Sequence, residues 1–465
     1  MSSTDVVVTA QKLGILHVDN VSTESVNEVN KYLQHNHENF HILWNVERNL
    51  HNHQVHYLLT DLALGASPDQ IRRAFETNTG YQRSFQAGDE SHQRVNTDEN
   101  WAAAIGQADY YASWIRYFSG EIALKGWQTV LIESLFARTA RADDLFGRMY
   151  EGETCLSGVA VGERVLTVWP GALHPIIHLG FGVEFEQPAI IAEALAQAAV
   201  HPVGGARYLL RVEELAKSSP IWTVRDELTS LFLKARANPV IKDADCWKPG
   251  SYERDGDVFD VAPPALVDLA ATYRLDRGMS EDLLHEHIAE MINVVAWFTC
   301  AAQRSDKQPK FDFFLIHAVN CSIFLSVFAN LPWLNLDAKI RLLEFKTRVD
   351  LVLYVTQGCP ELRVEEISQY EIRRPKCTTW EAVIERAKAI PCDGHVVKMI
   401  RALNHGAIVC RKYHEETWPI KGFMWIKMAN MVLDSTEDHP GVLEKWMRGP
   451  GFDKAWDVVP DRITP

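Results

Sequence analysis

The sequence predicts an all-α protein, a large globular fold of many helices with an active-site pocket in its interior between helices. Apolar residues recur every three or four positions through most of the 465-residue chain, which is the spacing of one helix face. One such stripe consists of Val55, Leu58, Leu59 and Leu62. Alternating apolar and polar runs, which would indicate half-buried strands, are few. The residues at expected helix boundaries agree with this pattern, since Gly65 suits the end of a helix and Ser67-Pro68 suits the start of the next one.

Composition excludes several classes of protein. The chain is 47% hydrophobic, which is enough for a large core, and its net charge is −14. Nucleic acids and anionic membranes attract clustered Lys and Arg, and no basic stripe is present. No apolar run approaches the roughly 20 residues that span a bilayer, and the N-terminus lacks a signal-peptide pattern. The eight cysteines form no Cys-x-x-Cys motif, so we expect reduced thiols and a cytoplasmic protein.

Three segments are expected along the chain. Residues 1–35 are polar and are predicted to form a loosely packed lead-in. Residues 36–433 carry the helical pattern and are predicted to form one catalytic domain, with a candidate boundary loop at 238–264, where Pro, Gly and Asp gather. Residues 434–465 are predicted to be a polar C-terminal tail.

The first informative helix is predicted over residues 51–65, and it opens with three histidines in six residues. His56 lies at the edge of the apolar stripe and His53 lies almost one turn earlier. Solvated side chains at the helix start remain an alternative, for His51 in particular.

Two further histidines, His174 and His178, stand four residues apart in the apolar run 173–185. Pro175 suits the first helical position, which places His174 at the cap and His178 one turn inside the helix. His178 would then face the interior. A core histidine bonded to a backbone carbonyl is the alternative interpretation.

The second half of the chain also places histidines in apolar helical segments. His317 is predicted to share a helix face with apolar side chains, and His395 to lie in the first turn of the helix that follows Cys392. Lys346 shares an apolar face of the helix 337–355. It is expected either to pair with Glu344 or Asp350, or to be a desolvated amine that reacts with CO2 to form a carbamate. Lys398, one turn after His395, is the rival lysine.

Several buried histidines in distant segments are most simply explained by a metal centre. No Gly-x-Gly-x-x-Gly follows a predicted strand and no P-loop motif occurs, so no nucleotide fingerprint supports a flavin or NADPH enzyme. A non-catalytic helical ligand-binding protein would need each histidine to find its own partner, which becomes harder as their number rises.

The histidine segments also carry a resemblance. The stretches HNHQVHYLLTDLALGASP, LHPIIHLGFGVEF, FFLIHAVN, RLLEFKTRVDLVLYV and DGHVVKMIRAL resemble, in order from residue 51 to 403, the motifs of the questin oxidase-like family. The resemblance implies an enzyme of fungal polyketide pathways that opens a ring of an anthraquinone or related aromatic polyketide by oxygen insertion. Members have been described as NADPH-dependent Baeyer–Villiger oxidases, and their histidines also suit a non-haem iron centre.

The favoured hypothesis is an oxygenase that cleaves a C–C bond of an anthraquinone-type polyketide with O2 at mononuclear iron(II). Its predicted metal ligands are His56, His178, His317, His395 and a carbamylated Lys346. His53 and His174 are the reserve candidates. Their expected roles are those of further ligands, of groups that orient the ligands, or of proton-transfer groups. The alternatives are an NADPH-dependent Baeyer–Villiger oxidase and a non-catalytic binding protein. The expected partners are a flat quinone or hydroquinone and O2, with no nucleic acid and no membrane.

Overall fold

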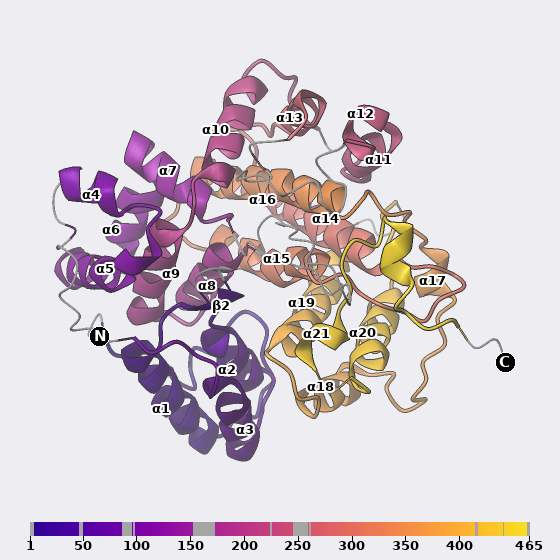
Figure 1. Cartoon of the computed structure of the whole chain (residues 1–465), viewed down its shortest axis with the longest axis horizontal. Helices are drawn as coiled ribbons and strands as arrows, with labels where there is room; N and C mark the ends of the chain where they lie inside the picture. Colours follow the sequence, from indigo (N-terminus) through magenta and orange to yellow (C-terminus); the bar gives the residue numbers. More distant parts are fainter. Residues whose placement is uncertain are drawn as a thin grey trace, which may run out of the picture. The chain divides into compact units, whose positions relative to one another are not determined.

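The computed structural model describes residues 4–45, 50–85, 95, 98–151, 173–223, 226–244, 259, 262–413, 417–439 and 441–462. Their regular structure is helical except for one two-stranded sheet, which confirms the predicted fold class. The chain forms two compact units (Figure 1). Unit 1 comprises residues 1–214, 249–262 and 330–339, and unit 2 comprises residues 215–248, 263–329 and 340–465. The single domain expected over 36–433 stays a prediction, and part of the candidate boundary loop 238–264 lies outside the described residues.

Unit 1 contains the first half of the helices and the sheet. Its helices are α1 (Thr23–Asn39), α2 (Gln54–Ala63), α3 (Pro68–Thr79), α4 (Asp98–Ala104), α5 (Tyr111–Lys125), α6 (Trp127–Leu131), α7 (Ala140–Arg148), α8 (His174–Glu184), α9 (Pro188–Val200) and most of α10 (Gly204–Ala216). A 3-10 turn at Ala108–Tyr110 precedes α5, and a π turn at Ile132–Phe136 follows α6. The antiparallel strands are β1 (Leu43–Asn45) and β2 (Leu50–His51).

The junction between α2 and α3 shows how local sequence sets the helix ends. Gly65 follows α2 with φ +73°, a conformation that a Cβ disfavours. Ser67 then caps α3 and forms a capping box with Gln70, and Pro68 occupies the first turn. The predicted end of one helix and start of the next are both confirmed.

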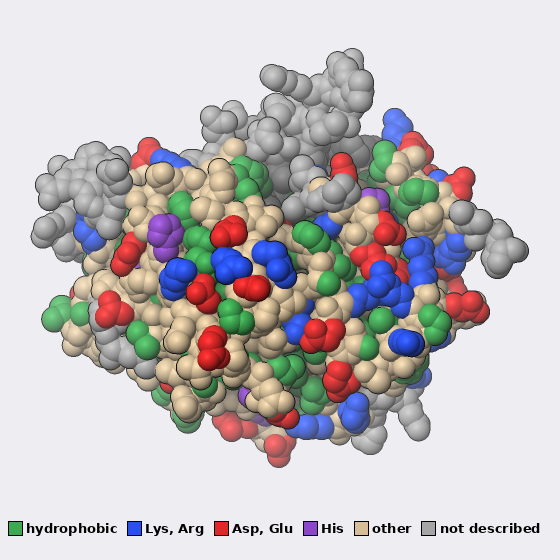
Figure 2. Space-filling model, turned by 90° about the horizontal axis from the view of Figure 1, so that it is seen from below, with side chains coloured by type: hydrophobic (Ala, Val, Ile, Leu, Met, Phe, Trp, Pro, Cys, Tyr) green, Lys and Arg blue, Asp and Glu red, His purple; other side chains and the backbone are tan. Residues whose placement is uncertain are grey.

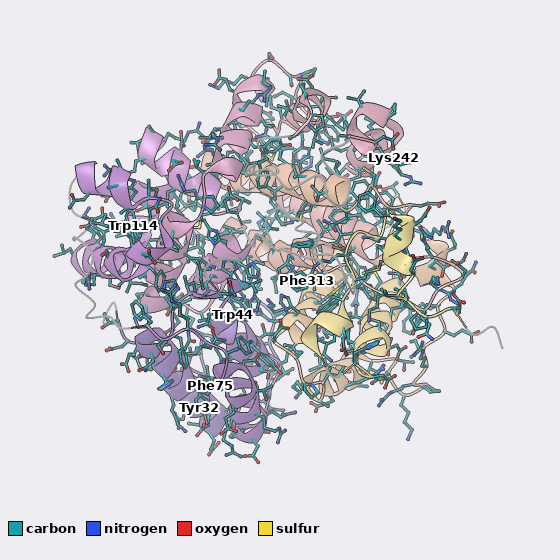
Figure 3. The ribbon with its side chains drawn as sticks, viewed as in Figure 1. Tyr32, Trp44, Phe75, Trp114, Lys242 and Phe313 are labelled. Atoms are coloured by element: carbon teal, nitrogen blue, oxygen red, sulfur yellow. The ribbon has the colours of Figure 1, made fainter. Side chains whose placement is uncertain are left out.

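The N-terminal segment is packed, which corrects the expected loose lead-in over residues 1–35. Helix α1 begins at Thr23 and buries an apolar stripe that includes Val29 and Leu33. Its Tyr32 ring stacks on Phe75 of α3, with ring centroids 4.4 Å apart (Figure 3). The overall polarity of the segment suggested loose packing, but the helical spacing of its apolar residues, such as Val29 and Leu33, is what determines burial here.

Unit 2 holds the remaining helices. They are α11 (Thr229–Ala237), α12 (Pro239–Lys242), α13 (Pro264–Ala271), α14 (Glu281–Cys300), α15 (Leu315–Ala329), most of α16 (Leu336–Thr356), α17 (Glu365–Ser368), α18 (Trp380–Lys388), α19 (His395–Cys410), α20 (Met424–Thr436) and α21 (Val442–Lys445). A 3-10 turn covers Asp453–Trp456. Helix α15 packs between α14 and α19. The expected polar tail from 434 onward is instead partly packed, because Met447, Trp456 and Val459 form a buried apolar cluster.

Two surface properties bear on the predicted partners. None of the helices in the described ranges is both long and apolar enough to cross a bilayer. On the face drawn in Figure 2, basic side chains are interspersed with acidic ones. This mixture agrees with the absence of a basic stripe in the sequence.

Candidate functional site

Helix α8 carries two of the predicted histidines into the core of unit 1. The helix begins at His174, one residue earlier than predicted, because Leu173 takes a left-handed conformation with φ 54° and serves as the N-cap. All the residues of α8 are buried. His178 lies one turn after His174, so the two imidazoles share a helix face.

Glu193 of α9 is the partner of His178. Its Oε2 lies 2.7 Å from His178 Nε2, and its Oε1 lies 2.6 Å from His37 Nδ1 of α1. Burial raises the pKa of Glu193, but hydrogen bonds from the two histidines outweigh it and lower this pKa to about 2. The same carboxylate raises the pKa of His37 against the opposing effect of burial. Glu193 is therefore ionised and accepts an N–H from both rings.

This contact decides which nitrogen of His178 can bind a ligand. Because an ionised carboxylate only accepts hydrogen bonds, His178 donates through Nε2 and its Nδ1 carries the lone pair. That Nδ1 is buried and has no hydrogen-bond partner in the described part of the chain. A carboxylate that orients a histidine in this way is a regular companion of metal-binding imidazoles.

A glycine brings α8 and α9 close enough for this contact. The two helices pack side by side (Figure 1), and a Cβ added at Gly182 would lie 2.9 Å from the backbone nitrogen of Ile191. Real side chains do not tolerate that separation, so only glycine permits this approach. Gly182 is one turn after His178, and Ile191 is two residues before Glu193.

The other predicted histidines of unit 1 gather beside this pair. Nε2 of His53 lies 2.7 Å from Nε2 of His174. The ring centroid of His56 lies 5.2 Å from that of His178. These four side chains are buried. Unit 1 thus brings together His53, His56, His174 and His178, as a common site requires.

Two histidines that the sequence did not single out as ligands extend the cluster. His51, which sits on β2 instead of a solvated helix start, stacks on His174 with ring centroids 4.1 Å apart. Its Nε2 lies 2.8 Å from Nε2 of His201, which caps the C-terminus of α9. We call His51, His53, His56, His174, His178 and His201 the histidine cluster.

Unit 2 holds the other two predicted histidines as a buried pair. Nε2 of His317 on α15 lies 3.0 Å from Nε2 of His395 at the start of α19. The Nδ1 of His317 donates to the carbonyl oxygen of Phe313 at 2.6 Å. The Nδ1 of His395 lies 2.8 Å from Oδ1 of Asp393. Burial raises the pKa of Asp393, but the charge of His395 and its hydrogen bond outweigh this and lower it.

A carbonyl oxygen cannot donate, so His317 carries a proton on Nδ1 and turns the lone pair of its Nε2 toward His395. A neutral His395 with its proton on Nδ1, facing the carboxylate of Asp393, would oppose this lone pair with another. Two lone pairs facing each other at 3.0 Å repel unless a cation lies with them, either a proton or a metal ion. Two imidazole ligands at right angles with bonds of about 2.1 Å have nitrogens about 3 Å apart. The pair therefore fits a metal ion.

Comparison with known proteins identifies the family of this chain. The model of the questin oxidase-like family matches residues 50–403. The chain belongs to the questin oxidase-like family. It is 36% identical to the Baeyer-Villiger monooxygenase dmxR6 of Cryptosporiopsis sp. and 35% identical to a questin oxidase of Aspergillus terreus, with 98% of both chains covered each time. A Baeyer-Villiger oxidase of Pestalotiopsis microspora is 35% identical over 95% of each chain. These names support an oxidoreductase.

Lys346 of this questin oxidase-like chain lies away from solvent on α16, as predicted, and the structure gives it a carboxylate partner. Its Nζ donates to both side-chain oxygens of Asp350, one turn later. Burial raises the pKa of Asp350 to about 6, although Lys346 opposes this shift. This ion pair is the first of the two alternatives expected for Lys346, and it forms because residues four apart share a helix face. The rival Lys398 is also buried, and its charge helps to lower the pKa of Asp393.

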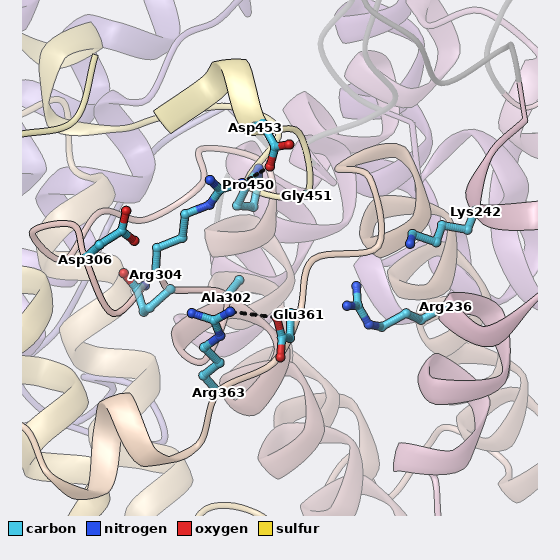
Figure 4. A pocket seen from close by; sticks show the side chains of 11 residues that line it. Arg236, Lys242, Ala302, Arg304, Asp306, Glu361, Arg363, Pro450, Gly451 and Asp453 are labelled. Atoms are coloured by element: carbon cyan, nitrogen blue, oxygen red, sulfur yellow. Dashed lines mark hydrogen bonds and ion pairs between the residues drawn. The ribbon is translucent and has the colours of Figure 1, made fainter. Parts of the chain in front are cut away.

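A hollow of about 350 Å³ in unit 2 lies among charged side chains (Figure 4). Its cations are Arg236, Lys242, Arg304 and Arg363. Glu361 pairs with Arg363 at 2.7 Å, and Asp453 pairs with Arg304. None of the predicted site residues lines this hollow.

The most important residue that sequence reasoning missed is Glu193. It is the single acidic residue in the apolar run PAIIAEALAQAAV of α9, and a buried carboxylate normally requires a partner. That anomaly was a usable signal, equal in kind to the lone histidines. Because Glu193 is ionised, a lysine carbamate is not the only source of negative charge near the histidines.

Proposed function

We propose that this chain is an oxygenase that cleaves a C–C bond beside a carbonyl of an anthraquinone-type aromatic polyketide, using O2 at one non-haem iron ion, in fungal secondary metabolism. The relatives named questin oxidase and Baeyer-Villiger monooxygenase support the reaction class. The observation that carries the metal is the close approach of the Nε2 atoms of His317 and His395, which lie 3.0 Å apart in the buried core of unit 2.

The donor set suits iron. Imidazole nitrogen is a good ligand for iron, and the free cysteines contribute no described thiolate cluster. The proposed ligands are His56, His178, His317 and His395, and iron held by them would supply the activation of O2. Glu193 and Asp393 are ionised carboxylates bonded to the rings of His178 and His395, and they add negative charge near a dication in a low-dielectric interior.

The protein side chains have separate roles in this proposal. Glu193, Asp393 and the Phe313 carbonyl fix which nitrogen of each ring faces the ion. His53 and His174, whose Nε2 atoms are 2.7 Å apart, share one hydrogen bond in which one ring donates and the other accepts. Such a pair can take a proton from a phenolic hydroxyl and pass it between the rings. Burial of the site excludes water from the reacting carbon.

An NADPH-dependent Baeyer–Villiger oxidase is the second candidate, because several relatives carry that reaction in their names. The two candidates differ in what is consumed. The iron oxygenase loses its activity when iron is removed, whereas the second candidate turns over without iron and oxidises NADPH in step with product.

Metal analysis of two single variants tests the proposal. We expect the purified wild type to contain iron, and His178→Ala and His317→Ala each to lose it while keeping the helical circular dichroism spectrum. His287→Ala is the matched control, because His287 is a buried histidine of α14 that is not among the proposed ligands. Full iron content in His178→Ala and His317→Ala would show that these are ordinary core histidines.

A further inference from the structure

Helix α9 carries a polar stripe on an otherwise apolar, fully buried helix. Glu193, Gln197 and His201 are spaced four residues apart and therefore share one face. The first residue of the stripe binds His178 and the last binds His51. Both ends of the stripe thus meet the histidine cluster of unit 1, and Gln197 lies between them.

Gln197 differs from its two neighbours because its side chain is unsatisfied. The residue is 0% exposed, and neither its amide oxygen nor its amide nitrogen has a hydrogen-bond partner in the structure described. Burying an amide without partners costs free energy that a hydrophobic residue of similar size would avoid. A group outside the described residues is therefore needed to satisfy it when the protein works.

The start of the same helix provides the contrast. Gln187, the N-cap of α9, is also buried, yet its oxygen accepts from the backbone N–H of Val7 at 2.8 Å. Its nitrogen donates to the carbonyl oxygens of Phe185 at 2.8 Å and Val7 at 3.1 Å. Gln187 is therefore a structural glutamine, whereas Gln197 has the same chemistry without a structural use.

We propose that Gln197 is a substrate-binding residue whose amide hydrogen-bonds a carbonyl oxygen and a neighbouring hydroxyl on the edge of a flat aromatic ligand. The carboxamide is planar and offers a donor and an acceptor side by side. A hydroxyl next to a quinone carbonyl offers the complementary acceptor and donor in one plane. Gln197 would thereby set which edge of the polycycle lies against the histidine cluster. The substrate class in this inference rests on the proposed function.

The test compares Gln197→Met with Gln187→Met, since methionine preserves the length of glutamine without its hydrogen-bonding groups. Binding of a hydroxyanthraquinone is followed by fluorescence quenching, and stability by urea unfolding. We expect Gln197→Met to weaken binding about 10- to 100-fold, as the loss of two hydrogen bonds implies. Its iron content and its urea midpoint should equal or exceed those of the wild type. Gln187→Met should unfold at lower urea and bind the quinone as tightly as the wild type.

The outcomes separate this inference from the proposed function. Tight quinone binding by Gln197→Met would overturn the role of Gln197. A lowered urea midpoint, like that of Gln187→Met, would also overturn it, because it would indicate that Gln197 binds a structural water. Failure of the wild type to bind any hydroxyanthraquinone would overturn it as well. Binding that depends on Gln197 without ring cleavage would support the inference and refute the oxygenase.

Discussion

Replacing Glu193 with glutamine tests the network around His178 most sharply. The substitution keeps the size of the side chain and removes its charge. One of the two hydrogen bonds to the rings is then lost, because the amide nitrogen of glutamine cannot accept the N–H of His178 or His37. We expect the variant to be less stable at neutral pH and to hold iron more weakly.

The size of the stability loss follows from the pKa of Glu193. Folding lowers this pKa from 4.5 to about 2, which corresponds to roughly 3 kcal/mol of folding free energy at pH 7. Breaking a buried ion pair costs a similar amount, about 3–5 kcal/mol. The raised pKa of His37 reports the same interaction and is not added again. Metal affinity should fall about 10- to 100-fold, as for other residues that orient metal-binding histidines.

The sign of the pH dependence follows as well. Because the folded pKa is below the unfolded pKa, the stabilisation is present above pH 4.5 and is lost as pH falls toward about 2. The difference between wild type and Glu193→Gln in urea unfolding should therefore be largest near neutral pH and shrink below pH 4.5. Glu186→Gln is the control, since Glu186 pairs with Lys12 at 2.6 Å on the surface and should cost about 0–1 kcal/mol. A Glu193→Gln variant within 0.5 kcal/mol of wild type at pH 7 would refute this account of the network.

Three further perturbations follow from the same geometry. Gly182→Ala should destabilise the protein and lower its iron content, because the new Cβ would lie 2.9 Å from the backbone of α9. The control is Gly120→Ala on α5, where a Cβ meets open space; this variant should be neutral or slightly stabilising in urea unfolding. Asp393→Asn should weaken iron binding about 10-fold or more, measured by chelator competition, because it removes the anion beside His395; unchanged affinity would contradict the orienting role. Lys346→Met should lower the free energy of unfolding by about 3–5 kcal/mol, and adding Asp350→Asn should recover most of this loss while iron is retained. A stably folded double variant without iron would instead favour the lysine carbamate, and so would iron binding by Lys346→Glu.

Much of the fold and several site residues could be predicted from the chain itself. Pro175 and the apolar residues around His174 and His178 determine a buried helix whatever it packs against, and the structure forms α8 there. The pairing of Lys346 with Asp350 could also have been derived, since both lie four residues apart on one helix. The hypothesis of a lysine carbamate was instead preferred over this ion pair.

The remaining features depend on packing that local pattern does not determine. Glu193 meets His178 because Gly182 lets α9 approach α8, and periodicity alone does not identify which two helices will touch. His51 was expected at a solvated helix start, but the pairing of β1 with β2 carries it to His174 and His201. The Nε2 pair of His317 and His395 joins residues 78 positions apart.

The most direct test of the central claim is X-ray diffraction from crystals of the iron-loaded protein, recorded at the iron absorption edge. The account predicts an anomalous peak about 2.1 Å from the Nε2 atoms of both His317 and His395. Well-ordered rings at this pair with no anomalous peak beside them, in crystals whose protein contains iron by elemental analysis, would contradict it.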